Sequence, residues 1–170
     1  MKNISFLRHA KSDWAMPFTS DHDRCLNDRG KKASKSMREF FFKTNHQFDI
    51  VFSSTAMRAI ETVELIRPAL RKAGVKFDKS LYTFDDRVLI DVISQISDEY
   101  SAVLIVGHNP AIQETALKLS STKSDNKFIQ RIQNKYPTGA FCSLCADISS
   151  WSHVGDTLFN LVEFVCPKDL

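Results

Sequence analysis

Two arginines and two histidines are the side chains of this sequence best placed to do chemistry together: Arg8, His9, Arg58 and His108. They lie just beyond three short apolar runs, at residues 3–7, 49–52 and 102–106. Each run is typical of a strand buried on both faces, and a helix signal follows each one. Because ligands bind beyond the carboxyl ends of the strands in an open α/β sheet, the four side chains are predicted to share one rim.

Such a set suits the transfer of a phosphoryl group. The neutral imidazole of His9 is a candidate nucleophile, with its second ring nitrogen expected to donate to a backbone carbonyl. The planar guanidinium groups of Arg8 and Arg58 match the equatorial oxygens of a phosphoryl group. His108 is expected to donate to a phosphoryl oxygen and to relay a proton. Taken singly, each of these residues could be an ordinary structural or solvent-exposed residue. Their predicted position at one rim favours a catalytic role.

Composition excludes several classes of protein. With 23 basic and 20 acidic residues the net charge is +3, which is too balanced to indicate a nucleic-acid or anionic-membrane partner. No apolar run approaches the ~20 residues of a membrane span, and the first residues lack the apolar region of a signal peptide. We therefore expect a cytoplasmic protein whose residues 1–170 form one domain.

No metal or cofactor is predicted. Cys142 and Cys145 form a nominal CxxC pair, but they lie in a strand-like run where residues three apart point to opposite faces. A structural zinc site requires a second pair of cysteine or histidine ligands at similar spacing, which the sequence lacks. The adjacent residues 21–23, Asp-His-Asp, have a spacing that makes a poor metal cage, and we interpret them as a solvated loop.

The remaining pattern predicts the elements that position these residues. A long loop over residues 8–25 leads to a helix capped by Asn27. A second helix, capped by Ser54 or Thr55, ends near Gly74. Further predicted elements are a strand at 76–82, a helix at 86–96, and a helix that Asn109 caps with Pro110 at its first position. A polar break at 120–125 and a short helix near 128–132 follow. The last two predicted strands, at 140–146 and 157–165, pair as an antiparallel hairpin. Together they predict a three-layer α/β/α sandwich around a mainly parallel sheet of about six strands.

Several ordered motifs resemble the histidine phosphatase superfamily, the phosphoglycerate mutase-like proteins, and more narrowly the SixA-type phosphohistidine phosphatases. The first is residues 7–14, which carry the Arg-His-Ala signature, and the second is residues 20–30, with an Asp-x-x-Arg-x-Leu-x-x-Arg-Gly pattern. The others are residues 53–62, with a Ser-Ser-x-x-x-Arg-Ala-x-x-Thr pattern, 106–110 and 135–139. Cys25 stands where proline is usual. The resemblance implies a phosphoglycerate mutase-like fold in which Arg8, Arg58 and His108 bind phosphoryl oxygens and His9 takes the phosphoryl group.

One departure from the family concerns the leaving group. Larger members carry an acid after the third strand that protonates an alkoxide, and here Tyr82 stands roughly in that place. Asp85 and Asp86 lie nearby but are interpreted more easily as the cap and first turn of the next helix. An imidazole leaving group depends far less on an acid than an alcohol does, so the departure favours P–N over P–O substrates.

These observations predict a phosphohistidine phosphatase. It is expected to act as a monomer on a histidine-phosphorylated phosphotransfer or signalling protein and to release inorganic phosphate. One alternative is a small-molecule phosphomonoesterase with the same mechanism. Another is a non-catalytic phospho-binding module, but binding alone does not require a nucleophile such as His9. Two interpretations of the nearby cations are equally compatible with the sequence: they attract an acidic partner, or they are simply solvated. These cations are Lys11, Arg24, Lys31 and Lys32.

Overall fold

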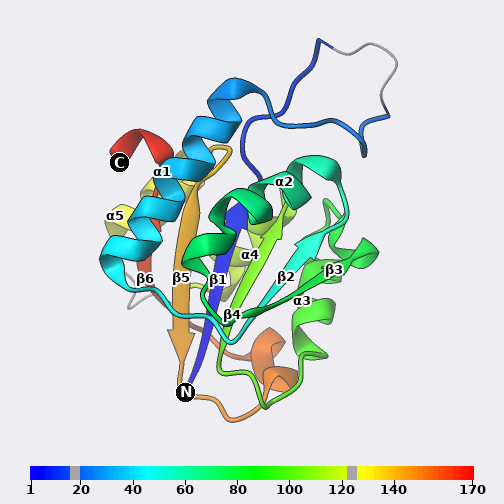
Figure 1. Ribbon diagram of the computed structural model, residues 1–170. Coiled ribbons are helices and arrows are strands. Elements are labelled where there is room, and N and C mark those ends of the chain that lie inside the picture. The colour runs from blue at the N-terminus through cyan, green and yellow to red at the C-terminus, as the bar shows by residue number, and fades with distance from the viewer. Residues whose placement is uncertain (16–19, 122–125) are drawn as a thin grey trace.

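The computed structural model describes residues 1–15, 20–121 and 126–170, and it contains one six-stranded sheet. The strands are β1 (Lys2–Arg8), β2 (Ile50–Ser54), β3 (Gly74–Asp78), β4 (Ala102–Gly107), β5 (Phe141–Ala146) and β6 (Asn160–Val165). Their order across the sheet is β3-β2-β4-β1-β5-β6 (Figure 1). Strands β1 to β4 pair in parallel, whereas β5 runs antiparallel to both β1 and β6. The predicted mainly parallel sheet is confirmed, as is the antiparallel pairing of its last two strands.

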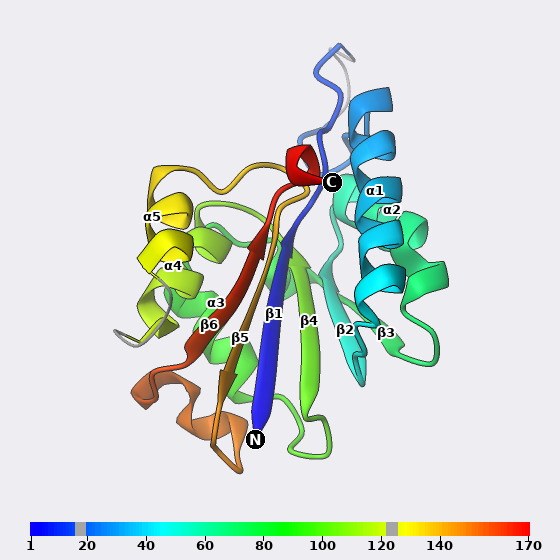
Figure 2. The same cartoon turned by 90° about the vertical axis from the view of Figure 1, so that its left-hand side faces the viewer.

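Helices cover both faces of this sheet. They are α1 (Asp28–Thr44), α2 (Met57–Ile66), α3 (Asp86–Ser94), α4 (Ala111–Leu119) and α5 (Asn126–Asn134). Seen along the sheet, α1 and α2 lie on one side, and α3, α4 and α5 lie on the other (Figure 2). The predicted three-layer α/β/α sandwich is therefore confirmed.

Strand β4 shows why the sheet is buried from both sides. Val103 and Ile105 belong to the apolar cluster that includes residues of α3 and α4, while Leu104 and Val106 belong to the cluster formed with α1 and α2. All four are fully buried. Alternate side chains of a strand point to opposite faces, so a continuous apolar run satisfies two helical layers at once.

Three predicted boundaries were wrong by three residues or more, and one of them is the start of the last strand, expected at residue 157 and observed at Asn160. The third strand was expected at 76–82, but β3 begins at Gly74 and ends at Asp78, whose carboxylate accepts from Ser80 N and starts a short 3-10 turn. The second helix was expected to continue to Gly74, but α2 ends at Ile66. Pro68 follows within a 3-10 turn, and it cannot donate the backbone hydrogen bond that would continue an α-helix.

The predicted helix caps are partly confirmed. Asn27 caps α1 by accepting from Gly30 N, and Asp85 caps α3 by accepting from Arg87 N. Neither Ser54 nor Thr55 caps α2, and Asn109 does not cap α4. Each of these three side chains bonds a residue distant in the chain instead: Ser54 bonds His108, Thr55 bonds His22, and Asn109 donates to the carbonyl of Tyr136.

Residues 16–19 of the predicted loop and 122–125 of the predicted polar break lie outside the described residues. None of the helices within the described ranges has the length and apolar content that a membrane crossing requires.

Candidate active site

The carboxyl ends of β1, β2 and β4 bring the four predicted side chains to one rim. Arg8 is the last residue of β1 and His9 follows it, Arg58 lies in the first turn of α2 beyond β2, and His108 follows β4. Arg58 Nε lies 3.3 Å from His9 Nε2, and Arg58 Nη2 lies 3.4 Å from His108 Nδ1. The two imidazole rings are 5.0 Å apart between centroids. All four side chains line one cavity of about 280 Å³.

His9 is held as a neutral base. Its side chain is buried, with 7% of the residue exposed, and its Nδ1 lies 2.8 Å from the backbone carbonyl of Ala10. Because a carbonyl can only accept, Nδ1 carries the proton and the lone pair of Nε2 faces Arg58. Burial lowers the pKa of His9 to about 3. The ring nitrogen that faces the cavity is therefore unprotonated at neutral pH, as in-line attack on phosphorus requires.

Arg58 is fixed from several sides. It is 2% exposed, and its guanidinium forms an ion pair with Asp21, with Nη2 and Oδ2 3.0 Å apart. Its Nη1 also donates to the backbone carbonyl of Asp21. A buried guanidinium needs such partners because an unpaired buried charge is costly. The result is an oriented fork that faces both histidines.

Asp21 is a site residue that the sequence interpretation missed, since residues 21–23 were expected to be a solvated loop. Its carboxylate also accepts from Arg24, with Nη2 and Oδ1 2.7 Å apart, and from the hydroxyl of Tyr82 at 2.6 Å. These bonds, that of Tyr82 foremost, hold the pKa of the carboxyl well below its usual range. The signal was present in the Asp-x-x-Arg spacing of Asp21 and Arg24.

His108 has protein partners at both ring nitrogens. It is 2% exposed, and its Nε2 lies 2.8 Å from Ser54 Oγ. With Arg58 donating to Nδ1, Nε2 carries the proton and donates to Ser54. A hydroxyl can donate as well as accept, so Ser54 can keep this bond if the proton moves to Nδ1. His108 could then donate Nδ1–H to a phosphoryl oxygen, which is the role predicted for it. This requires that Arg58 Nη2 donate to the phosphoryl group as well, instead of to His108 Nδ1.

Arg8 is positioned by the segment before β5. Its Nη1 donates to the carbonyl of Tyr136 at 2.7 Å, and the Tyr136 hydroxyl donates back to the carbonyl of Phe6 at 2.9 Å. Gly139, with a φ of 77°, donates its backbone N–H to the carbonyl of Arg8 at 3.0 Å. Among the described residues, Arg8 Nε is buried and has no hydrogen-bond partner. It is a donor that a phosphoryl oxygen would satisfy.

The cavity around these residues is suited to an anion. Besides the two histidines, its walls carry four cationic side chains, whereas Asp21 is the one carboxylate that lines it within the described residues. The cations are Lys11, Arg8, Arg24 and Arg58. In the part of the chain that the structure describes, no group of three or more His, Cys, Asp or Glu side chains is placed to hold a metal ion.

Comparison with known proteins gives the family. The model of the histidine phosphatase superfamily (branch 1) matches residues 4–85, a segment that includes Arg8, His9 and Arg58. The chain belongs to the histidine phosphatase superfamily. This phosphatase is 36% identical over 166 residues to an uncharacterised protein of Mycobacterium leprae, a match that covers 95% of this chain and 100% of the relative.

Solved structures support the same fold for the phosphatase. The structure of SixA from Agrobacterium tumefaciens is similar with a TM-score of 0.81 and 23% identity, covering 98% of both chains. The protein histidine phosphatase SixA complexed with tungstate is similar with a TM-score of 0.77 and 18% identity, again covering 98% of both chains. At these identities the likeness shows the phosphoglycerate mutase-like fold.

The low pKa of His9 and His108 leads to a prediction for nuclear magnetic resonance. Burial lowers the pKa of each ring to about 3, so both imidazoles of the free phosphatase are expected to remain neutral at pH 5. Long-range nitrogen–proton spectra recorded between pH 4.5 and 8 would measure this, with the His9→Ala and His108→Ala variants assigning the signals. A titration of the His9 ring with a midpoint near 6.5 would contradict it.

Proposed function

We propose that this phosphatase removes the phosphoryl group from a phosphohistidine side chain of a protein substrate, through a covalent phospho-His9 intermediate. In the first step, His9 Nε2 attacks phosphorus and the P–N bond of the substrate breaks, with its electron pair passing to the substrate nitrogen. The other ring nitrogen of the substrate takes a proton from solvent, so histidine leaves as a neutral imidazole. In the second step, water attacks phospho-His9 and yields inorganic phosphate and free His9.

The side chains at the rim supply the charge that both steps require. Arg8 and Arg58 would bind the equatorial oxygens, where the charge of the transferring group is spread. His108 would donate to a third oxygen. The cationic walls of the cavity support these roles, and an oxyanion, tungstate, is bound in the similar SixA structure.

The state of the nearby carboxyl groups is the observation that carries the choice of substrate. Asp21 lines the cavity, but Tyr82, Arg24 and Arg58 keep it ionised, so it is a poor proton donor. Asp85 forms an ion pair with Arg87, which lowers the pKa of Asp85 to about 2, and Asp86 forms an ion pair with Lys118 at 3.2 Å. Because none of these three described carboxyl groups is free to donate a proton, a leaving group that departs as neutral imidazole is favoured over an alkoxide.

We further infer that residues 1–170 act as one catalytic domain, as a monomer and in the cytoplasm, on a phosphotransfer or signalling protein. A screen of histidine-phosphorylated carrier proteins for release of inorganic phosphate would identify that protein. Failure to dephosphorylate any phosphohistidine, combined with turnover of sugar phosphates, would instead favour a small-molecule phosphomonoesterase.

The engagement of Asp21, Asp85 and Asp86, the carboxyl groups described near the cavity, predicts that the rate depends steeply on the pKa of the leaving group. Rates on phosphohistidine and aryl phosphates are expected to exceed those on alkyl phosphates by about 10²-fold or more, the contribution that a general acid usually makes. The Asp85→Asn and Asp86→Asn variants are expected to stay within about twofold of wild type on phosphohistidine. Initial rates over a series of leaving groups of graded pKa measure both effects. If the dependence is flat in wild type and steep in one variant, that aspartate is a general acid.

A further inference from the structure

A second hollow of about 350 Å³ adjoins the catalytic cavity. Lys11 and Thr138 line both, and four cationic side chains surround the second: Lys11, Arg29, Lys135 and Lys168. They come from four separate segments of the chain, namely the stretch after His9, the start of α1, the stretch after α5 and the C-terminal 3-10 turn. We refer to this feature as the basic hollow.

The charge of the basic hollow is unbalanced. No aspartate or glutamate is among its lining residues, and none of the four cations forms an ion pair within the described residues. Asp169 follows Lys168 in the chain, but its carboxylate is engaged by Arg131 and by the backbone N–H of Cys166, the latter at 3.0 Å. The four side chains are exposed, and an anion bound between them would offset the mutual repulsion of their like charges.

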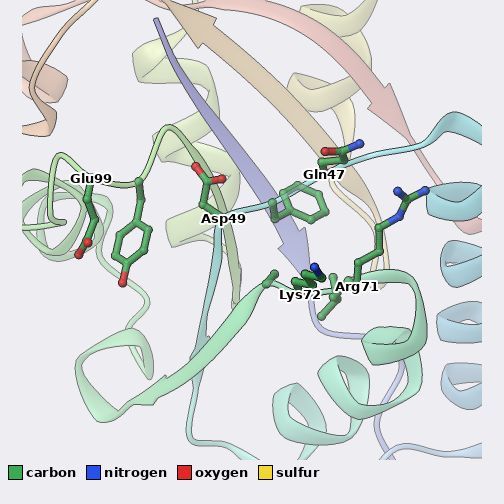
Figure 3. Close-up of a pocket in the computed structure, with 9 residues that line it drawn as sticks. Gln47, Asp49, Arg71, Lys72 and Glu99 are labelled. Atoms are coloured by element: carbon green, nitrogen blue, oxygen red, sulfur yellow. The ribbon is translucent and has the colours of Figure 1, made fainter.

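The opposite end of the sheet shows that this imbalance is local. There a hollow of about 580 Å³ is lined by residues of both signs (Figure 3). Asp49 and Glu99 supply its negative charge, and Arg71 and Lys72 supply its positive charge. An excess of one sign is therefore a feature of the hollow next to the catalytic cavity, and not of every hollow on this surface.

Close backbone packing fixes the walls of the basic hollow relative to the catalytic rim. A Cβ atom on Gly30 would collide with the backbone carbonyl of Lys11, so the start of α1 lies directly against the chain that follows His9. A Cβ atom on Gly139 would lie 2.9 Å from Pro167 Cγ, so the C-terminal turn lies against the residue that bonds Arg8. The backbone segments that carry Lys11, Arg29 and Lys168 are thus packed beside the phosphoryl site.

We propose that the basic hollow docks an acidic segment of the phosphorylated protein, next to the phosphohistidine in the catalytic cavity. This inference rests on the proposed function and adds the chemistry by which the substrate is recognised. Carboxylates of that segment would lie among the four cations and replace water there. Such charge complementarity acts mainly on the encounter and on substrate affinity, so it is expected to lower KM and to leave kcat unchanged.

The test uses two synthetic peptides of equal length, each phosphorylated by phosphoramidate on a single histidine. In one peptide the flanking residues are Asp and Glu, and in the other they are Asn and Gln. The wild-type phosphatase is expected to prefer the acidic peptide by about tenfold in kcat/KM at low ionic strength, with the preference shrinking as salt is added. The Lys135→Glu/Lys168→Glu variant is expected to lose the preference through KM.

The controls separate docking from catalysis and from folding. Turnover of phosphoramidate itself by the double variant is expected to match wild type, which also shows that the variant is folded. The Arg71→Glu/Lys72→Glu variant makes the same change of charge in the hollow at the opposite end and is expected to keep the preference. A preference that survives in the double variant, or that is absent from wild type, overturns the docking proposal. If wild type cleaves phosphoramidate but neither peptide, the proposed function itself fails.

Discussion

Replacing His9 by alanine is expected to lower kcat by at least about 10⁴-fold, because the variant has no nucleophile to accept the phosphoryl group. The fold is expected to survive, since the backbone N–H of His9 still bonds the carbonyl of Gly107 and Arg58 keeps its ion pair with Asp21. Rapid-quench labelling with radioactive phosphoramidate should trap an acid-labile phosphoenzyme in wild type and none in the variant.

His153 provides the matched control for this experiment. It is exposed in the 3-10 turn between β5 and β6, and it does not line the catalytic cavity. The His153→Ala variant should label like wild type. Phosphoenzyme that persists in the His9→Ala variant would show that another residue is the nucleophile.

Replacing Arg58 by alanine is expected to lower kcat/KM by about 10²- to 10³-fold, the cost of removing one oriented donor to a developing charge. The loss has a second cause, because Asp21 would keep its negative charge beside the phosphoryl group after losing Arg58, one of the two arginines that pair with it. Vanadate, an oxyanion that resembles phosphate, should inhibit wild type strongly and the variant weakly. Inhibition constants measured for both proteins test this.

Arg67 is a control just beyond the end of the same helix. It follows α2, is exposed and pairs with Glu64 at 2.6 Å, so the Arg67→Ala variant should bind vanadate as wild type does. Lysine at position 58 should restore little, because an ammonium group cannot reproduce the planar fork that reaches both histidines and Asp21. Equal inhibition of wild type and Arg58→Ala would place Arg58 outside the phosphoryl site.

The parts of the fold that the sequence predicted well are those whose burial leaves a strong pattern. Strands β1, β2 and β4 lie inside the sheet, and their sequences are continuous apolar runs. The ends of these runs could therefore be located from the sequence, and they point to His9, Arg58 and His108. Strand β3 lies at the edge with most of its side chains exposed. Its boundaries depend on pairing with β2, Val51 opposite Val75, and no local pattern carries that information.

The parts of the site that were missed depend on contacts between distant segments. Asp21 meets Arg58 and Tyr82, which are 37 and 61 residues away along the chain, and its own loop has no periodicity. The carbonyl of Tyr136 reaches Arg8 because β5 runs antiparallel to β1 and so starts at the catalytic rim. An antiparallel hairpin of β5 and β6 could be predicted from the sequence, but the pairing of β5 with β1 could not.

The two neutral histidines of the rim also affect how well the folded chain withstands acid. In the unfolded chain each ring takes up a proton near its ordinary pKa of about 6.5, whereas in the folded chain the pKa of each is about 3. Between these values the unfolded chain binds more protons, so acidification draws the equilibrium toward unfolding. The contribution of these rings to stability is therefore greatest above pH 6.5 and declines as the pH falls toward 3. A nucleophile kept ready for attack is thus obtained at the expense of acid resistance.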